Sequence, residues 1–138
     1  MIIAVVDGQG GGIGVAIIKA LRNNFGHDLE IWGLGTNAVA AVQMMKAGAN
    51  KCASGENAIR LGAGRADVLM GTISIVLADS MMGEMTPLAA EAVASSPALK
   101  ILLPLSQSKV EVEGVVDEPL PHLIEMMMGQ FREVLANV

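Results

Sequence analysis

Apolar and polar positions follow two different periods along the chain, and each change of period marks a predicted boundary between strand and helix. An apolar run at residues 2–6 precedes a glycine-rich turn, after which apolar residues recur at helical spacing through residue 21. A short apolar run followed by a helical segment recurs along the rest of the chain. We predict strands at 2–6, 29–34, 49–53, 67–71 and 100–104. We predict helices from residue 15 to about residues 24–26 and at 38–47, 58–61, 88–95 and 120–135.

Two further segments have patterns that fit more than one structure. Residues 73–82 form a short apolar run that fits a helix or an extended strand, and we predict a helix. Residues 110–115 alternate valine with polar residues, which is typical of a strand with one exposed face. Because this segment is acidic, we place it at the edge of the sheet.

The alternation of strands and helices predicts an α/β fold. We expect a three-layer, Rossmann-like single domain over residues 1–138, with a mainly parallel sheet of five or six strands and helices on both faces. In such a sheet, ligands bind at the carboxyl ends of the strands. The residues expected there are small and polar: Asp7–Gly12, Gly35–Asn37, Ser54–Asn57, Gly71, Thr72, Ser106 and Gln107.

The composition of the chain limits its expected cellular location and its expected partners. The chain has 138 residues, of which 52% are hydrophobic, and its longest uncharged runs are too short for a bilayer, so we expect no membrane partner. No signal-peptide pattern opens the chain and it has a single cysteine, which predicts a cytoplasmic protein. A net charge of −5 and three aromatic residues argue against nucleic acid as a partner. Ten methionines favour a homo-oligomer, with a dimer as the simplest form.

The glycine-rich turn is the strongest candidate for a binding site. Five glycines lie within residues 8–14, a density that suits positive φ angles or close approach by a ligand. The helix that follows would present free N–H groups and the positive end of its dipole to a phosphate. We expect the N–H groups of Gly10–Gly14 to hold a phosphate, and Thr36, Asn37 and Asn57 to bond a sugar or base.

The expected ligand is therefore a nucleotide, a dinucleotide or another phosphorylated small molecule. The predicted ligand-binding residues are Asp7, Gly8, Gln9, Gly10, Gly11, Gly12, Ile13, Gly14, Thr36, Asn37, Ser54, Glu56, Asn57 and Thr72. The alternative is a non-enzymatic interaction or regulatory module in which the glycine turn only packs a strand against a helix.

The spacing of the glycines distinguishes between known phosphate-binding loops. It matches neither G-x-G-x-x-G nor the P-loop, which needs a lysine before serine or threonine. Gly8, Gly12, Ile13 and Gly14 give G-x-x-x-G-I-G, which resembles the nucleotide loop of short-chain dehydrogenases. Those enzymes use a tyrosine, and this chain has none. The acidic residue expected after the second strand is also replaced by Gly35–Asn37, so hydride transfer of that type is not expected.

Several longer segments extend the resemblance over nearly the whole chain. They are Val5–Gly14, Leu34–Ala38, Ser54–Ile59, Gly83–Pro87 and Asp117–His122. With these segments the sequence resembles a small bacterial family of uncharacterised Rossmann-like proteins. The resemblance implies the Rossmann-like fold, and it implies no activity, because none has been assigned to that family.

The remaining candidates for chemistry each have a structural alternative. Asp7 and Glu56 could face a ligand or Mg²⁺ together, or each could stabilise a helix terminus. His122 and Glu125 have a spacing that can bind metal, but no third ligand accompanies them, and a solvated helix face is the alternative. Cys52 is expected to pack inside a strand.

No catalytic residue can be assigned from the sequence. Hydroxyl groups at Ser80, Ser106 and Ser108 have no histidine at an assignable position, so no nucleophilic triad is predicted. The methionine clusters at 81–82 and 126–128 suit a core or a subunit interface. The sequence therefore fits an enzyme as well as a binding protein without catalytic activity.

Overall fold

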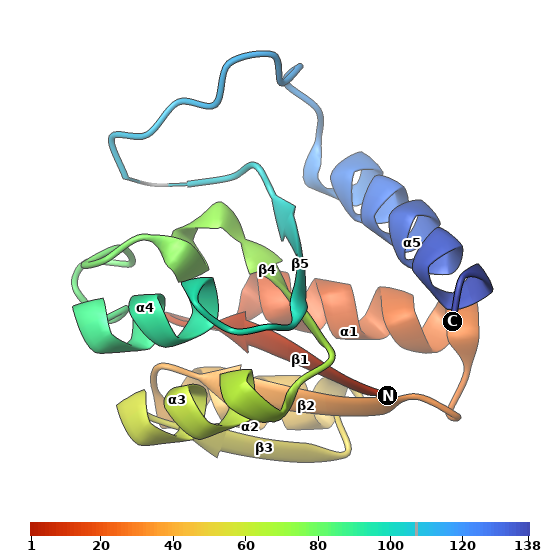
Figure 1. The fold of residues 1–138 in the computed structure, drawn as a ribbon, viewed down its shortest axis with the longest axis horizontal. Helices are drawn as coiled ribbons and strands as arrows, with labels where there is room; N and C mark the ends of the chain where they lie inside the picture. The colour runs from red at the N-terminus through yellow and green to blue at the C-terminus, as the bar shows by residue number, and fades with distance from the viewer. Residues whose placement is uncertain (107) are drawn as a thin grey trace.

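The computed structural model describes residues 1–106 and 108–138. Strands and helices alternate along it, as Figure 1 shows. The strands are β1 (Ile2–Asp7), β2 (Glu30–Gly35), β3 (Lys51–Ser54), β4 (Val68–Thr72) and β5 (Leu99–Leu103). The helices are α1 (Gly12–Phe25), α2 (Ala38–Ala47), α3 (Glu56–Arg65), α4 (Pro87–Ala94) and α5 (Leu120–Ala136), with a 3₁₀ turn, η1, at Ile73–Val76.

The five strands form one parallel sheet in the order β3-β2-β1-β4-β5. The chain starts in the centre, moves outward through β2 to β3, and then crosses back to β4 on the other side of β1. The strand order therefore reverses between β1 and β4, which is where a crevice forms in sheets of this kind. This arrangement confirms the predicted α/β fold with a parallel sheet.

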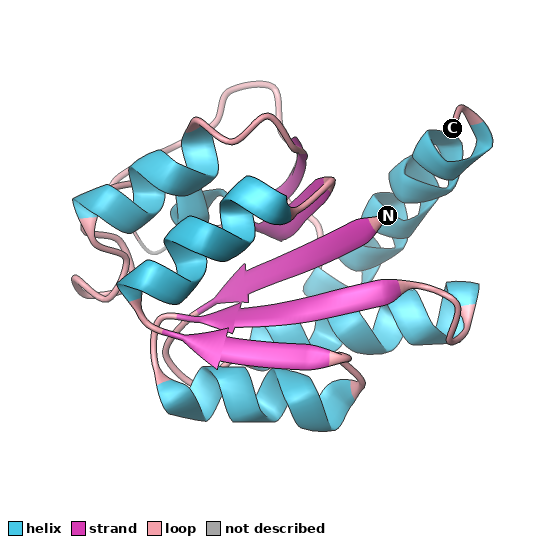
Figure 2. Cartoon of the chain, turned by 60° about the horizontal axis from the view of Figure 1, so that its bottom comes forward, coloured by secondary structure: helices cyan, strands magenta, loops and turns pink. Residues whose placement is uncertain are grey.

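Each face of the sheet has its own hydrophobic core. Ile3 and Val5 of β1 pack with α1, α2 and α5, whereas Ala4 and Val6 of the same strand pack with α3 and α4. Successive side chains of a strand point to opposite faces, so a central strand covered on both sides must be apolar at every position. The continuous apolar run at residues 2–6 is the sequence signal of this burial, and it produces the three layers in Figures 1 and 2.

Helix-capping signals in the sequence predicted two helices well. The Asn37 side chain accepts a hydrogen bond from the Ala40 N–H at 2.8 Å, and α2 covers the predicted residues 38–47. Thr86 caps α4 in the same way, with Pro87 in the first turn. The other predicted strands and helices are present with shifted ends, and α3 is longer than the predicted 58–61.

The helix predicted at residues 73–82 is wrong. Only the 3₁₀ turn η1 forms, and the chain then takes left-handed conformations at Asp79, Met81 and Met82, with φ of 64°, 58° and 57°. The run begins with β-branched Ile73, Ile75 and Val76, which are weak helix formers. The Ser80 hydroxyl donates to the Ser74 carbonyl at 2.6 Å, which fixes a turn instead of a helix.

The edge strand predicted at residues 110–115 is also wrong. These residues form no strand and are all exposed, including Val110, Val112 and Val115. Gly114 has φ of 84° and turns the chain within the alternating segment. The pattern had the period of a strand, but the valines do not cover an apolar face in the described structure.

Within the described residues, no helix is both long enough and apolar enough to cross a membrane.

The prediction for Cys52 is wrong, because this residue lies on β3 with its side chain exposed. All four residues of this edge strand are exposed, so packing in the sheet does not cover the thiol.

Candidate functional site

The carboxyl ends of the strands converge at one edge of the sheet, where the arrowheads of β1, β2 and β3 point the same way in Figure 2. A cavity of about 290 Å³ lies at this edge, beside the point where the strand order reverses. Its lining residues come from the end of β1 and the turn after it, from α1, from the end of β4, from η1 and the turn that follows it, and from the segment after β5. They are Asp7, Gln9, Ile13, Thr72, Ser74, Met81, Leu105 and Ser106.

Asp7, the last residue of β1, holds the glycine turn in place. Its carboxylate accepts hydrogen bonds from the N–H groups of Gly8 at 2.8 Å and Gly14 at 2.7 Å. Burial raises the pKa of Asp7, while these two N–H groups lower it and oppose the shift. The carboxylate thus stabilises the start of α1, which is the structural role that the sequence allowed for it.

Three of the five glycines are explained by close packing. A side chain at Gly8 would meet the Thr36 hydroxyl, and one at Gly14 would lie 2.7 Å from the sulfur of Met44. Gly11 has φ of 76°, and a Cβ there would lie 2.9 Å from the Cα of Ala40. These glycines let the turn fit between β1 and α2.

Gly10 and Gly12 have no such explanation. A Cβ added at either position meets no atom within 4 Å, and neither residue has a left-handed φ. Neither N–H group donates a hydrogen bond to a residue that the structure describes. The two N–H groups belong to the turn that opens α1, where the helix dipole is positive.

Glu84 is a site residue that the sequence analysis missed. One oxygen of its carboxylate, Oε1, accepts hydrogen bonds from the Gln9 N–H at 2.9 Å, the Thr36 hydroxyl at 2.7 Å and the Asn37 amide at 2.8 Å. Thr36 and Asn37 follow β2, so Glu84 joins the ends of β1 and β2 from a distant turn. Among the described residues, no partner of Glu84 Oε2 is found.

Glu84 also supplies a carboxylate beside the end of β2, where the neighbouring sequence has no acidic residue. Many Rossmann folds carry an acidic residue after the second strand, and here Gly35–Asn37 stand in its place. The turn at residues 79–84 brings Glu84 to the side chains of Thr36 and Asn37, whose donors are therefore already occupied. No local sequence pattern signals this, because the contact joins residues 48 positions apart.

The pH dependence of stability provides a test of the Glu84 contacts. Hydrogen bonds from Thr36 and Gln9 hold the pKa of Glu84 below its usual 4.5. Their contribution to stability is therefore present above the unfolded-state pKa and is lost as the pH falls through the lower folded-state pKa. We expect the free energy of unfolding of Glu84→Gln to fall less than that of the wild type between about pH 5 and pH 3. Urea denaturation across this range measures it.

The matched control for this experiment is Glu91→Gln, at an exposed position of α4. It removes one carboxylate without touching the Glu84 contacts, so its pH profile should follow that of the wild type. Parallel profiles for the wild type and Glu84→Gln would show that the three hydrogen bonds to Glu84 contribute nothing to stability.

The other predicted ligand-binding residues divide into two groups. Thr72 lines the cavity, and its hydroxyl caps η1 by accepting from the Ser74 N–H at 3.2 Å. The predicted residues at the end of β3 and just after it do not line the cavity. Ser54 ends an exposed strand, Glu56 accepts from the Thr86 hydroxyl, and Asn57 accepts from Arg60. Glu56 thus has the helix-terminus position that the sequence allowed, in the first turn of α3.

The described residues contain no group of three or more histidine, cysteine, aspartate or glutamate side chains placed to bind a metal. His122 pairs with Glu118 at 2.6 Å on an exposed helix end, and this contact raises the pKa of His122.

Ser106 reaches the cavity, and its hydroxyl lies 3.4 Å from the Ser74 hydroxyl. Gln107 was also expected at this edge, but it lies outside the described residues.

The chain matches one known protein family over nearly its whole length. The model of a domain of unknown function, DUF3842, matches residues 2–136, which is nearly the whole chain. The chain belongs to the DUF3842 family. No curated protein and no solved structure matches it. Membership of DUF3842 agrees with the resemblance to an uncharacterised family and leaves the function to be inferred from the site.

Proposed function

We propose that this DUF3842 protein binds a phosphorylated small molecule at the carboxyl edge of the sheet. The phosphate lies on the N–H groups of Gly10 and Gly12, at the start of α1. The rest of the ligand extends into the cavity between β1 and β4, toward the hydroxyl groups of Thr72, Ser74 and Ser106.

The observation that carries this proposal is the open space at Gly10 and Gly12. The fold itself accounts for Gly8, Gly11 and Gly14, but it would accommodate a side chain at the other two positions. Glycine at a site without steric or conformational need suits the close approach of another group to the backbone. Two N–H groups at a helix N-terminus, without a partner among the described residues, supply the hydrogen bonds and positive potential that a phosphate requires.

The size of the cavity limits the ligand. A volume of about 290 Å³ lies at the small end of the range of ligand pockets, roughly 300–1,000 Å³. Glu84 already engages the donors of Thr36 and Asn37, so these two side chains are not available to bond a sugar or base. A sugar phosphate or a mononucleotide therefore fits the site better than a dinucleotide.

The charge of Asp7 affects how the site accepts an anion. Its carboxylate lines the cavity, and an ionised carboxylate repels a nearby phosphate. Burial raises the pKa of Asp7, and its carboxylate accepts the N–H groups of Gly8 and Gly14, which partly offset its negative charge beside the ligand. The N–H groups of Gly8 and Gly14 already donate to Asp7, so they are not available to the ligand.

A thermal-shift panel tests the proposal. Inorganic phosphate, ribose 5-phosphate and the common nucleoside monophosphates are added at millimolar concentration to the purified protein. A ligand that binds only the native state at 100 times its Kd adds about 2.7 kcal/mol of stability, which raises Tm by roughly 10 °C for a chain of this size. We expect at least one sugar phosphate or mononucleotide to raise Tm more than its unphosphorylated form does. The absence of such a difference across the panel would contradict the proposal.

One observation favours a second candidate, a module with a purely structural glycine turn. Asp7 and Glu84 already accept the N–H groups of Gly8, Gln9 and Gly14, so much of the turn is satisfied by the protein itself. Under this alternative no member of the panel shifts Tm, and the function lies in contacts with other proteins.

A further inference from the structure

β3 is an edge strand of the sheet and is exposed along its whole length. All four residues, Lys51–Ser54, are exposed, and their side chains are small except for that of Lys51. An uncovered edge strand presents free N–H and C=O groups to any strand that approaches. Natural proteins block such edges with charges, proline or a covering element, and β3 has only one lysine at its start.

The pairing of β3 with β2 determines which backbone groups face outward. Ser54 is the partner of Gly35, and the Gly55 N–H donates to the Gly35 carbonyl at 2.9 Å. In a parallel ladder, a residue bonds to the two neighbours of its partner, so Ala53 and Gly55 face β2. The N–H and C=O groups of Cys52 and Ser54 therefore point away from the sheet.

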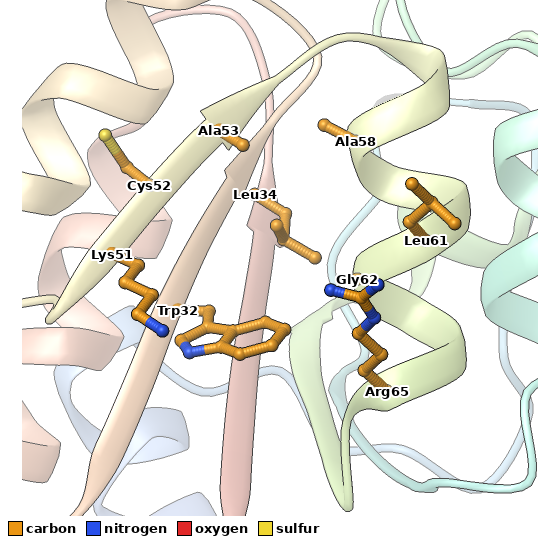
Figure 3. A pocket seen from close by; sticks show the side chains of 9 residues that line it. All are labelled: Trp32, Leu34, Lys51, Cys52, Ala53, Ala58, Leu61, Gly62 and Arg65. Carbon is orange, nitrogen blue, oxygen red and sulfur yellow. The ribbon is translucent and has the colours of Figure 1, made fainter.

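Exposed apolar side chains flank this edge on both faces of the sheet. Val42 and Met45 of α2 are 45% and 44% exposed, and Leu61 of α3 is 43% exposed. On the α3 side, Trp32, Leu34 and Leu61 line an open groove of about 320 Å³ beside β3, shown in Figure 3. An apolar rim around free backbone groups suits a protein partner that adds a strand.

We infer that the β3 edge pairs with the β3 edge of a second copy of this chain, antiparallel and around a twofold axis. The outward groups of Cys52 and Ser54 then form about four hydrogen bonds with those of the second copy. The two five-stranded sheets become one continuous sheet. Helices α2 and α3 of each copy meet their counterparts across the axis and cover the apolar rim.

The distribution of charge favours a second copy in this orientation. Lys51 begins β3, and Arg65 lies at the same end because α3 runs back along the strand, so both flank Trp32 in Figure 3. Glu56 lies at the opposite end, directly after β3. Antiparallel pairing places the cations of one copy beside Glu56 of the other, whereas a parallel arrangement would place like charges together.

Two registers bring Cys52 close to the axis. With Cys52 opposite Ser54 of the second copy, the outward groups of both residues are paired. With Cys52 opposite Cys52, only the hydrogen bonds of that pair form, because the Asn50 N–H that would face Ser54 already donates to the Ile31 carbonyl. Hydrogen-bonded partners in antiparallel strands have Cα atoms about 5.5 Å apart, within the range that a disulfide bridges. Cysteines at facing positions of the two β3 strands are therefore close enough to form a disulfide that links the two copies.

The oligomeric state provides the first test. Sedimentation equilibrium should show a dimer, and Leu61→Glu or Val42→Glu should raise its dissociation constant at least 10-fold. The matched control is Leu88→Glu, at a similarly exposed apolar position of α4, which should leave the dimer unchanged. Circular dichroism and thermal melting verify that each variant is folded. A monomer at high micromolar concentration would overturn the inference.

Disulfide trapping provides the second test and does not depend on weakening the protein. The wild type, Cys52→Ser/Ala53→Cys, and Ser54→Cys with Cys52 retained are oxidised mildly, and linked dimers are measured on non-reducing gels. Efficient linking at one or more of these positions supports the pairing and identifies its register. Cys52→Ser/Leu99→Cys places the thiol at the start of β5, on the other edge of the sheet. Linking there in place of β3 would overturn the inference.

Discussion

Replacing Gly11 with alanine is expected to lower the free energy of unfolding by about 2–4 kcal/mol. The residue has φ of 76°, a conformation that costs an L-residue energy, and its new Cβ would lie 2.9 Å from the Cα of Ala40. That neighbour is backbone of α2, so it cannot rotate away as a flexible side chain could. Urea denaturation of the purified variant measures the loss.

The matched control is the same substitution one residue later. Gly12 is the first residue of α1, and a Cβ there meets nothing within 4 Å. Alanine lowers the entropy of the unfolded chain and is the better helix former, so Gly12→Ala should be neutral or stabilising by up to about 1 kcal/mol. Equal destabilisation by the two substitutions would show that the distinction between packed and open glycines is wrong.

The sequence predicted the layers of the fold well because burial on both faces leaves a simple pattern. The run Ile2–Val6 has no polar residue, and the structure buries Ile3–Val6 between two cores. Capping residues were equally informative, since the hydrogen bond that the Asn37 side chain accepts from the Ala40 N–H spans only three positions. Signals that depend on neighbours in sequence were therefore sufficient for the strands and most helices.

The prediction failed where distant residues determine the conformation. The segment after β4 has the composition of a buried helix, but its left-handed turn brings Glu84 to Thr36 and Asn37. Only the folded structure shows that contact. The same holds for the glycine turn, because the sequence counts five glycines alike while the structure separates three packed ones from two open ones.

The residues of the candidate site also differ between the sequence prediction and the structure. The expected set extended to the residues after β3, but Glu56 and Asn57 bond within or beside α3. The cavity lies instead on the β4 side of β1, with Ser74 and Ser106 in its lining. Strand order determined this outcome, and strand order is not visible in one sequence.

Introducing leucine at Gly12 is expected to weaken the binding of a phosphorylated ligand by roughly 100-fold. The side chain would occupy the open space above the turn and keep a phosphate from the N–H groups of Gly10 and Gly12. Each hydrogen bond to a charged group contributes about 1.5–3 kcal/mol, so losing one or two has an effect of this size. The fold should persist, since the new side chain meets no atom near its Cβ.

A direct test is a calorimetric titration of the strongest ligand from the thermal-shift panel into three proteins: the wild type, Gly12→Leu and Gly129→Leu. Gly129 is also open and helical, but it lies in α5, away from the turn. If the turn holds the phosphate, Gly129→Leu binds like the wild type, while Gly12→Leu loses about two orders of magnitude in affinity and stays folded. Equal affinity in all three proteins would contradict a phosphate site at Gly10 and Gly12.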